Sequence, residues 1–202
     1  MISSALHGIL NALLRLQSVL SLPVCLLPVF RMGNHPTEER QYFIFGQGTL
    51  KGQKLYCARA NLTACEVVSV YNALIYFGRR YPFEIIKRRF FNRGALTLFF
   101  LGLFGGNPYS IGRVLKSFHM DHKAVSPEKM AEDGAYIISF WNGKSDPSLH
   151  TVFCVRDGGR FLGYNIHSND RSPRLFDPEK YGGLFIRIYY LGKRGTNQVG
   201  GL

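Results

Sequence analysis

The feature that most constrains how this chain can fold is Cys65, which lies at the start of a run of apolar residues with helical spacing. Thr63 and Glu66 have the spacing of a capping box, in which a hydroxyl and a carboxylate satisfy free N–H groups at a helix start. An apolar-periodic run follows, so the pattern predicts a helix over residues 64–77 with Cys65 in its first turn. Free N–H groups and the positive end of the helix dipole favour an anion there, so we expect a thiol shifted toward the nucleophilic thiolate.

A second pattern, far downstream, offers a base for this cysteine. Two strand-like runs, 150–156 and 160–167, flank the turn signal Asp-Gly-Gly at 157–159 and predict a β-hairpin. If the turn is 157–158, His150 faces Asn165, and an amide oxygen can hold the imidazole.

A turn at Gly158-Gly159 instead places His167 opposite His150. The sequence does not decide between the two registers. His167 is therefore the alternative base, with Asn169 or Asp170 near it in sequence.

The chain has a cysteine at a helix start, then a histidine on a strand and an asparagine about fifteen residues later. This order resembles that of the catalytic residues in the papain-like cysteine peptidases. The segments 64–74, 105–112 and 163–165 look more narrowly like the double-glycine-leader (bacteriocin-processing) peptidase-like proteins of Gram-positive bacteria. The likeness covers roughly residues 55–170.

The resemblance implies a catalytic triad of Cys65 as nucleophile, His150 as base and Asn165 as the group that orients the imidazole. It implies a peptide or protein substrate, a thioacyl-enzyme intermediate and no cofactor. The chain departs from the family six residues before the cysteine, where the usual oxyanion-binding glutamine is replaced by Arg59. Asn61 is the nearest amide, so Arg59 and Asn61 are both oxyanion candidates.

The order of the expected elements indicates an α+β, papain-like domain. Helices, including the cysteine helix, come first, and strands follow from residue 134 onward. We expect this peptidase-like domain to span 33–193 and a flexible tail to span 194–202. Further elements are predicted by local pattern: a strand at 42–45, helices at 83–91 and from Asn107-Pro108, and strands at 135–141 and 184–191.

Residues 1–32 form a separate apolar helical segment. Arg15 and two prolines, Pro23 and Pro28, interrupt it, so it makes a poor membrane span and a poor signal peptide. We expect a packed or peripheral amphipathic helix, with an anchoring role as the alternative. Four cysteines without framework spacing favour free thiols, and hence a cytoplasmic or membrane-peripheral protein rather than a secreted one.

The net charge of +12 over 202 residues predicts attraction to anionic surfaces, either a membrane or a cell-wall polymer. No nucleic-acid motif accompanies this charge, so we do not expect nucleic acid as the partner. His119, Asp121 and His122 lie close in sequence, but nothing near them completes a metal site. The sequence does not indicate an oligomeric state.

These features favour a cysteine peptidase-like hydrolase. The same thiol also serves a cell-wall amidase or endopeptidase, or an acyltransferase. The missing glutamine supports another alternative, a non-catalytic papain-like binding protein.

Overall fold

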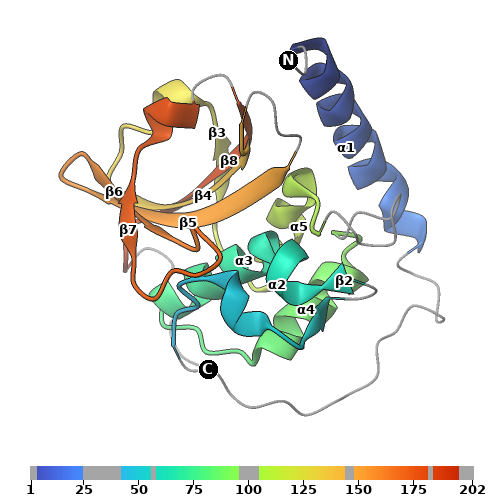
Figure 1. The fold of residues 1–202 in the computed structure, drawn as a ribbon, viewed down its shortest axis with the longest axis horizontal. Coiled ribbons are helices and arrows are strands. Elements are labelled where there is room, and N and C mark those ends of the chain that lie inside the picture. Colours follow the sequence, from blue (N-terminus) through green and yellow to red (C-terminus); the bar gives the residue numbers. More distant parts are fainter. Residues whose placement is uncertain are drawn as a thin grey trace.

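Helices occupy the first half of the chain and an antiparallel sheet the second, which confirms the predicted α+β architecture (Figure 1). The computed structural model describes residues 4–24, 42–55, 58–95, 105–143, 148–181 and 184–195. Most of the predicted tail and residues 25–41 therefore lie outside the described residues.

The helices include one buried helix, which carries the cysteine. They are α1 (Ser4–Val24), α2 (Ala60–Thr63), α3 (Cys65–Tyr76), α4 (Phe83–Asn92) and α5 (Ile111–Ser117). Every residue of α3 from Cys65 to Leu74 is buried, so the predicted helix at 64–77 is confirmed as the centre of the helical layer. Short 3-10 turns also occur: η2 (Gln47–Leu50), η4 (Pro108–Ser110), η5 (Pro127–Lys129) and η6 (Pro178–Tyr181).

Six strands form one sheet in which all neighbours run antiparallel. Their spatial order is β3 (Lys123–Val125), β8 (Phe185–Gly192), β4 (Gly134–Trp141), β5 (Leu149–Asp157), β6 (Arg160–Tyr164) and β7 (Arg174–Phe176). The predicted strands at 135–141, 150–156 and 184–191 are confirmed. The three-residue edge strands β3 and β7 are too short to stand out in the sequence. A small separate ladder joins β1 (Lys54–Leu55) to β2 (Ala58–Arg59).

The two faces of the sheet bury different clusters, as the alternation of side chains along a strand requires. Ile137 and Phe153 join the core that α3, α4 and α5 cover. Val152 and Cys154 of β5 join a second cluster on the opposite face. Within β5, therefore, odd-numbered residues face the helices and even-numbered residues face away from them.

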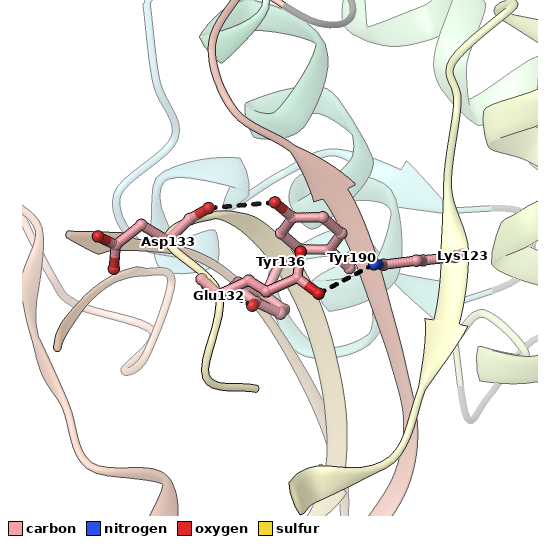
Figure 2. Close-up of polar contacts among 5 residues, drawn as sticks. All are labelled: Lys123, Glu132, Asp133, Tyr136 and Tyr190. Atoms are coloured by element: carbon pink, nitrogen blue, oxygen red, sulfur yellow. Dashed lines mark hydrogen bonds and ion pairs between the residues drawn. The ribbon is translucent and has the colours of Figure 1, made fainter. Parts of the chain in front are cut away.

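Polar contacts tie the start of β4 to β3 and β8 (Figure 2). The Tyr190 hydroxyl donates to the Asp133 carbonyl at 3.1 Å, and the Tyr136 hydroxyl donates to the Glu132 carbonyl at 2.5 Å. Lys123 Nζ lies 3.1 Å from Glu132 Oε1. Burial raises the pKa of Tyr136 to about 12, so its hydroxyl remains a donor at neutral pH.

The predicted strand at 42–45 is wrong, because a side chain replaces the missing strand partner. Asn72 of α3 accepts from the Ile44 amide at 2.9 Å and donates to the Ile44 carbonyl at 2.8 Å. This pair of bonds satisfies the backbone of the segment and fixes it against the buried helix.

Candidate active site

Cys65 is the first residue of α3, as the sequence predicted, but the predicted capping box is wrong. Ala64 is the N-cap residue and makes no side-chain cap. The Thr63 hydroxyl donates to the Arg59 carbonyl at 3.1 Å instead, because Thr63 belongs to the preceding turn of helix α2.

The Glu66 carboxylate accepts hydrogen bonds from the Cys65 thiol and from two neighbouring groups. Oε2 accepts from Cys65 Sγ at 3.3 Å and from the Gly106 amide at 3.0 Å. Oε1 accepts from the Thr151 hydroxyl of β5 at 3.3 Å. Gly106 must lack a side chain here, since a Cβ would lie 2.7 Å from Glu66 Cβ. Glu66 thus joins the start of α3, the 105–107 segment and β5 at one buried point.

Burial reverses the expected ionisation of the thiol. Desolvation raises the pKa of Cys65 well above its ordinary value, and the charge and hydrogen bond of Glu66 raise it further. The backbone amides of Thr151 and Glu66 lower the pKa, but by less. The expectation of a resting thiolate is therefore wrong, because the helix start is buried beside a carboxylate. Burial likewise raises the pKa of Glu66 to about 7.

His150 lies near the start of β5, half-buried, with its ring edge-to-face on Phe140 at 5.8 Å between centroids. Its Nε2 atom lies 2.7 Å from the Asn165 backbone carbonyl. A carbonyl oxygen only accepts, so Nε2 carries the proton and Nδ1 of the neutral ring does not. Burial lowers the pKa of His150, and the Asn165 carbonyl partly offsets this effect.

The hairpin adopts the second of the two predicted registers. Asp157 pairs with Arg160 and Phe153 with Tyr164, so the turn residues are Gly158 and Gly159.

This register would extend to a pair between His150 and His167, but β6 ends before it. Asn165 has φ of 63°, a left-handed conformation that turns the chain out of the sheet. His167 is exposed, and its backbone amide donates to the Asp170 carboxylate at 2.8 Å.

The Asn165 side chain points to η2 and not to the imidazole. Its Oδ1 atom accepts from the Gln47 amide at 2.7 Å, and its Nδ2 atom donates to Gln47 Oε1 at 3.4 Å. The predicted contact between the Asn165 amide oxygen and His150 is therefore wrong. The turn at Asn165 presents the backbone carbonyl to the ring in place of the side chain.

The cysteine half of the site meets the backbone of β5, whereas the His150 ring projects from the face of β5 that carries Phe140 and the second cluster. The Cys65 sulfur lies beside the Thr151 amide, which belongs to the peptide bond that joins His150 to Thr151. The Ser69 hydroxyl donates to the Thr151 carbonyl at 3.0 Å and fixes this contact. Among the described residues, no hydrogen bond joins Cys65 to His150: Sγ donates to Glu66, and Nε2 donates to the Asn165 carbonyl.

The two oxyanion candidates lie just before the cysteine helix. Arg59 ends β2 with an exposed side chain, and half-buried Asn61 lies in α2. Neither side chain hydrogen-bonds Cys65 in the part of the chain that the structure describes. Sequence reasoning missed Gln47 as the partner of Asn165, and no local pattern around η2 signals that long-range contact.

Three further expectations from the sequence concern metal binding, the state of the cysteines and membrane crossing. The His122 ring bonds the Met120 carbonyl at 2.9 Å, and the described residues contain no group of three metal-ligating side chains. Cys65 and Cys154 are free thiols, whereas Cys25 and Cys57 lie outside the described residues. No described helix has the length and apolar character needed to cross a membrane.

Comparison with known proteins finds a likeness at the level of structure. No family model matches the chain, and no curated protein matches it. One similar solved structure is the peptidase domain of Streptococcus ComA, a bifunctional ABC transporter involved in a quorum-sensing pathway. The match covers 64% of this chain and 90% of that one, with 10% sequence identity and a TM-score of 0.47.

Proposed function

We propose that this protein is a cysteine peptidase-like hydrolase that cleaves peptide or amide bonds with Cys65 as the nucleophile. The observation that carries the proposal is the position of the Cys65 sulfur at the start of α3, beside the peptide bond that follows His150. A thiol, a neutral imidazole and free N–H groups at a helix start are the components that thiol acyl transfer requires.

The hydrogen bond to the Asn165 carbonyl supports His150 as the base. It fixes the tautomer in which Nδ1 is unprotonated, and the lowered pKa keeps the ring neutral at pH 7. In the proposed reaction Nδ1 takes the proton from Cys65 Sγ, and the sulfur attacks the substrate carbonyl to form a C–S bond. The imidazolium then protonates the leaving amine as the C–N bond breaks, and water hydrolyses the thioester.

The oxyanion that forms in this reaction needs hydrogen-bond donors. The Cys65 backbone amide at the start of α3 is one donor, and Arg59 or Asn61 is proposed as the second. Asn165 orients His150 through its backbone carbonyl, and its side chain supports that turn through Gln47.

The bond from Cys65 to Glu66 describes the resting state in this proposal. In this proposal the thiol leaves Oε2 of Glu66 to reach the imidazole, and the hydrogen bond that it gives up is weak because a thiol is a weak donor. Glu66 then controls how much of the protein holds a protonated, unreactive thiol.

Peptide cleavage by three proteins tests the proposal. A mixed peptide library is incubated with the wild type, with Cys65→Ala and with Cys154→Ala, and the products are identified by mass spectrometry. Cys154 is the matched control, since it is also a free and buried thiol but lies on the other face of the sheet. We expect cleavage by the wild type and Cys154→Ala and none by Cys65→Ala; equal cleavage by all three proteins would overturn the proposal.

The burial of Cys65 favours one second candidate, a non-catalytic protein that binds peptides. The residue is 4% exposed, and its pKa is raised rather than lowered. Peptide binding that persists in Cys65→Ala, without cleavage by the wild type, would support this candidate. Cleavage of wall polymers or transfer of the acyl group to an amine would instead assign the same thiol to an amidase or an acyltransferase.

A further inference from the structure

Helix α1 is fixed to the rest of the protein through one of its faces. Leu10 packs in the cluster that holds Trp141, and the His7 ring stacks on the same indole at 5.3 Å between centroids. Farther along the helix, the Ser21 hydroxyl donates to the Gly94 carbonyl at 2.7 Å. Figure 1 shows α1 at the periphery of the molecule, beside α5 and at the opposite end from β7.

The solvent-facing side of α1 is apolar. Its large aliphatic side chains are between 38% and 65% exposed: Leu6, Ile9, Leu13, Leu16, Val19 and Leu20. Apart from Val19 they recur every three or four residues, which aligns them along the helix, and we name this aligned set the outer stripe. Arg15 is the one Lys, Arg, Asp or Glu residue in α1. A surface helix normally directs polar residues to solvent, so an apolar solvent face marks an interaction site.

We propose that the outer stripe binds the surface of an anionic lipid bilayer, with α1 lying parallel to the membrane plane. This inference is independent of the proposed hydrolase function. It is carried by the exposed apolar stripe together with the positive charge of the protein.

Three arginines lie on or beside α1, two of them, Arg113 and Arg187, on the side that packs against the protein and not within the outer stripe. The guanidinium groups of Arg15 and Arg187 lie over the Tyr109 ring, at 5.1 and 5.9 Å from its centroid. Arg113 Nη1 donates to the Ser18 hydroxyl of α1 at 3.0 Å. Cations beside an apolar helix face match the two layers of an anionic membrane surface, acyl chains below and phosphates above.

Charge also favours lipid over a second copy of the chain as the occupant. Each copy carries +12, so two copies repel one another, whereas an anionic bilayer attracts each of them. At 21 residues α1 is about 31 Å long, but no described helix is apolar enough to cross a membrane. A helix that lies in the interface fits both observations.

Vesicle co-sedimentation of the full chain tests this inference. The probes are vesicles of phosphatidylcholine alone and vesicles that also contain phosphatidylglycerol. Leu13→Ser/Leu16→Ser removes the middle of the outer stripe without changing the charge. Leu175→Ser is the matched control, since Leu175 is 74% exposed but lies on β7, away from α1. Trp141 fluorescence checks that α1 remains packed in each variant, because its indole stacks on His7.

We expect the wild type and Leu175→Ser to sediment with the anionic vesicles, and salt to weaken this binding. The double variant should bind at least about ten-fold more weakly, because it loses two aliphatic side chains that the bilayer would bury. Wild-type protein that remains in the supernatant, or a double variant that binds as the wild type does, would contradict the inference. Light scattering that detects a dimer abolished by the double variant, without lipid binding, would assign the stripe to a second copy instead.

Discussion

Cys65 lies beside the backbone of β5 and His150 belongs to that strand, but the fold holds the two side chains in different ways. A side chain, the Glu66 carboxylate, binds the Cys65 thiol in a buried position. A backbone atom, the Asn165 carbonyl, binds the half-buried His150 ring. The tautomer of His150 therefore follows from the path of the chain, whereas the protonation of Cys65 follows first from its burial and then from one neighbouring side chain, Glu66. Substitutions should separate these two dependences.

The largest expected effect comes from removing the base. His150→Ala should reduce the rate of peptide cleavage by roughly 10²–10⁴-fold, the usual contribution of general acid–base catalysis. Cleavage kinetics would measure it, with His167→Ala as the matched control because His167 is exposed and is not bonded to the site. A loss in His167→Ala equal to that in His150→Ala would contradict the assignment of the base.

Removing the buried carboxylate should change how stability depends on pH. Burial raises the pKa of Glu66 from 4.5 to about 7 in the folded protein. The folded state therefore keeps a proton that the unfolded chain loses above pH 4.5, and the free energy of unfolding falls as the pH rises toward 7. Above that pH the loss amounts to about 3 kcal/mol.

In Glu66→Gln this pH-dependent loss should disappear. Urea unfolding of both proteins at a pH near 5 and near 8 would measure the difference. The contribution of His150 has the opposite sign, but both proteins share it and it cancels. Glu132→Gln, at an exposed carboxylate, should retain the wild-type slope. If the free energy of unfolding falls between these pH values as much in Glu66→Gln as in the wild type, the pKa of Glu66 is not raised in the folded protein.

Gly106→Ala should disturb the cysteine half of the site and leave the histidine half intact. The added Cβ would lie 2.7 Å from Glu66 Cβ and 2.9 Å from its Cγ, which displaces the carboxylate. We expect a loss of about 1–3 kcal/mol in the free energy of unfolding, the usual cost of overpacking. Gly8→Ala, where nothing lies within 4 Å, is the control and should not destabilise. Equal stability of Gly106→Ala and wild type would mean that this contact is loose.

The smallest effect on catalysis is expected at Asn165. Asn165→Gly keeps the backbone carbonyl that binds His150 and tolerates the φ of 63°, but it loses the bonds to Gln47. The cleavage rate should fall much less than in His150→Ala, while the free energy of unfolding decreases by about 1–2 kcal/mol. A rate as low as that of His150→Ala would show that the side chain, not the carbonyl, positions the ring.

The sequence predicted the parts of the fold that depend on local periodicity. The helix that starts at Cys65 and the strands β4, β5 and β8 follow from apolar spacing, and Asn107 caps η4 by accepting from the Tyr109 amide at 3.0 Å. The register of the hairpin did not follow, because the two candidate turns at 157–159 differ by one residue and both suit glycine.

The polar contacts of the site depend on long-range packing that no local pattern records. Glu66 has the spacing of a capping residue, but the 105–107 segment and β5 approach it and recruit its carboxylate. Burial at that junction outweighs the helix dipole, which is why the pKa of Cys65 rises although its position suggests the reverse. The left-handed turn at Asn165 depends in the same way on its distant partner Gln47.

The pH dependence of Cys65 alkylation by iodoacetamide tests the central claim most directly. The modified Cys65 peptide is quantified by mass spectrometry in wild type, His150→Ala and Glu66→Gln. If His150 accepts the thiol proton, alkylation near pH 7–8 should fall at least about ten-fold in His150→Ala and rise in Glu66→Gln, which lacks the carboxylate that raises the thiol pKa. A wild-type rate that follows a buried thiol titrating above its ordinary range, unchanged in His150→Ala, would contradict the claim and favour a binding protein.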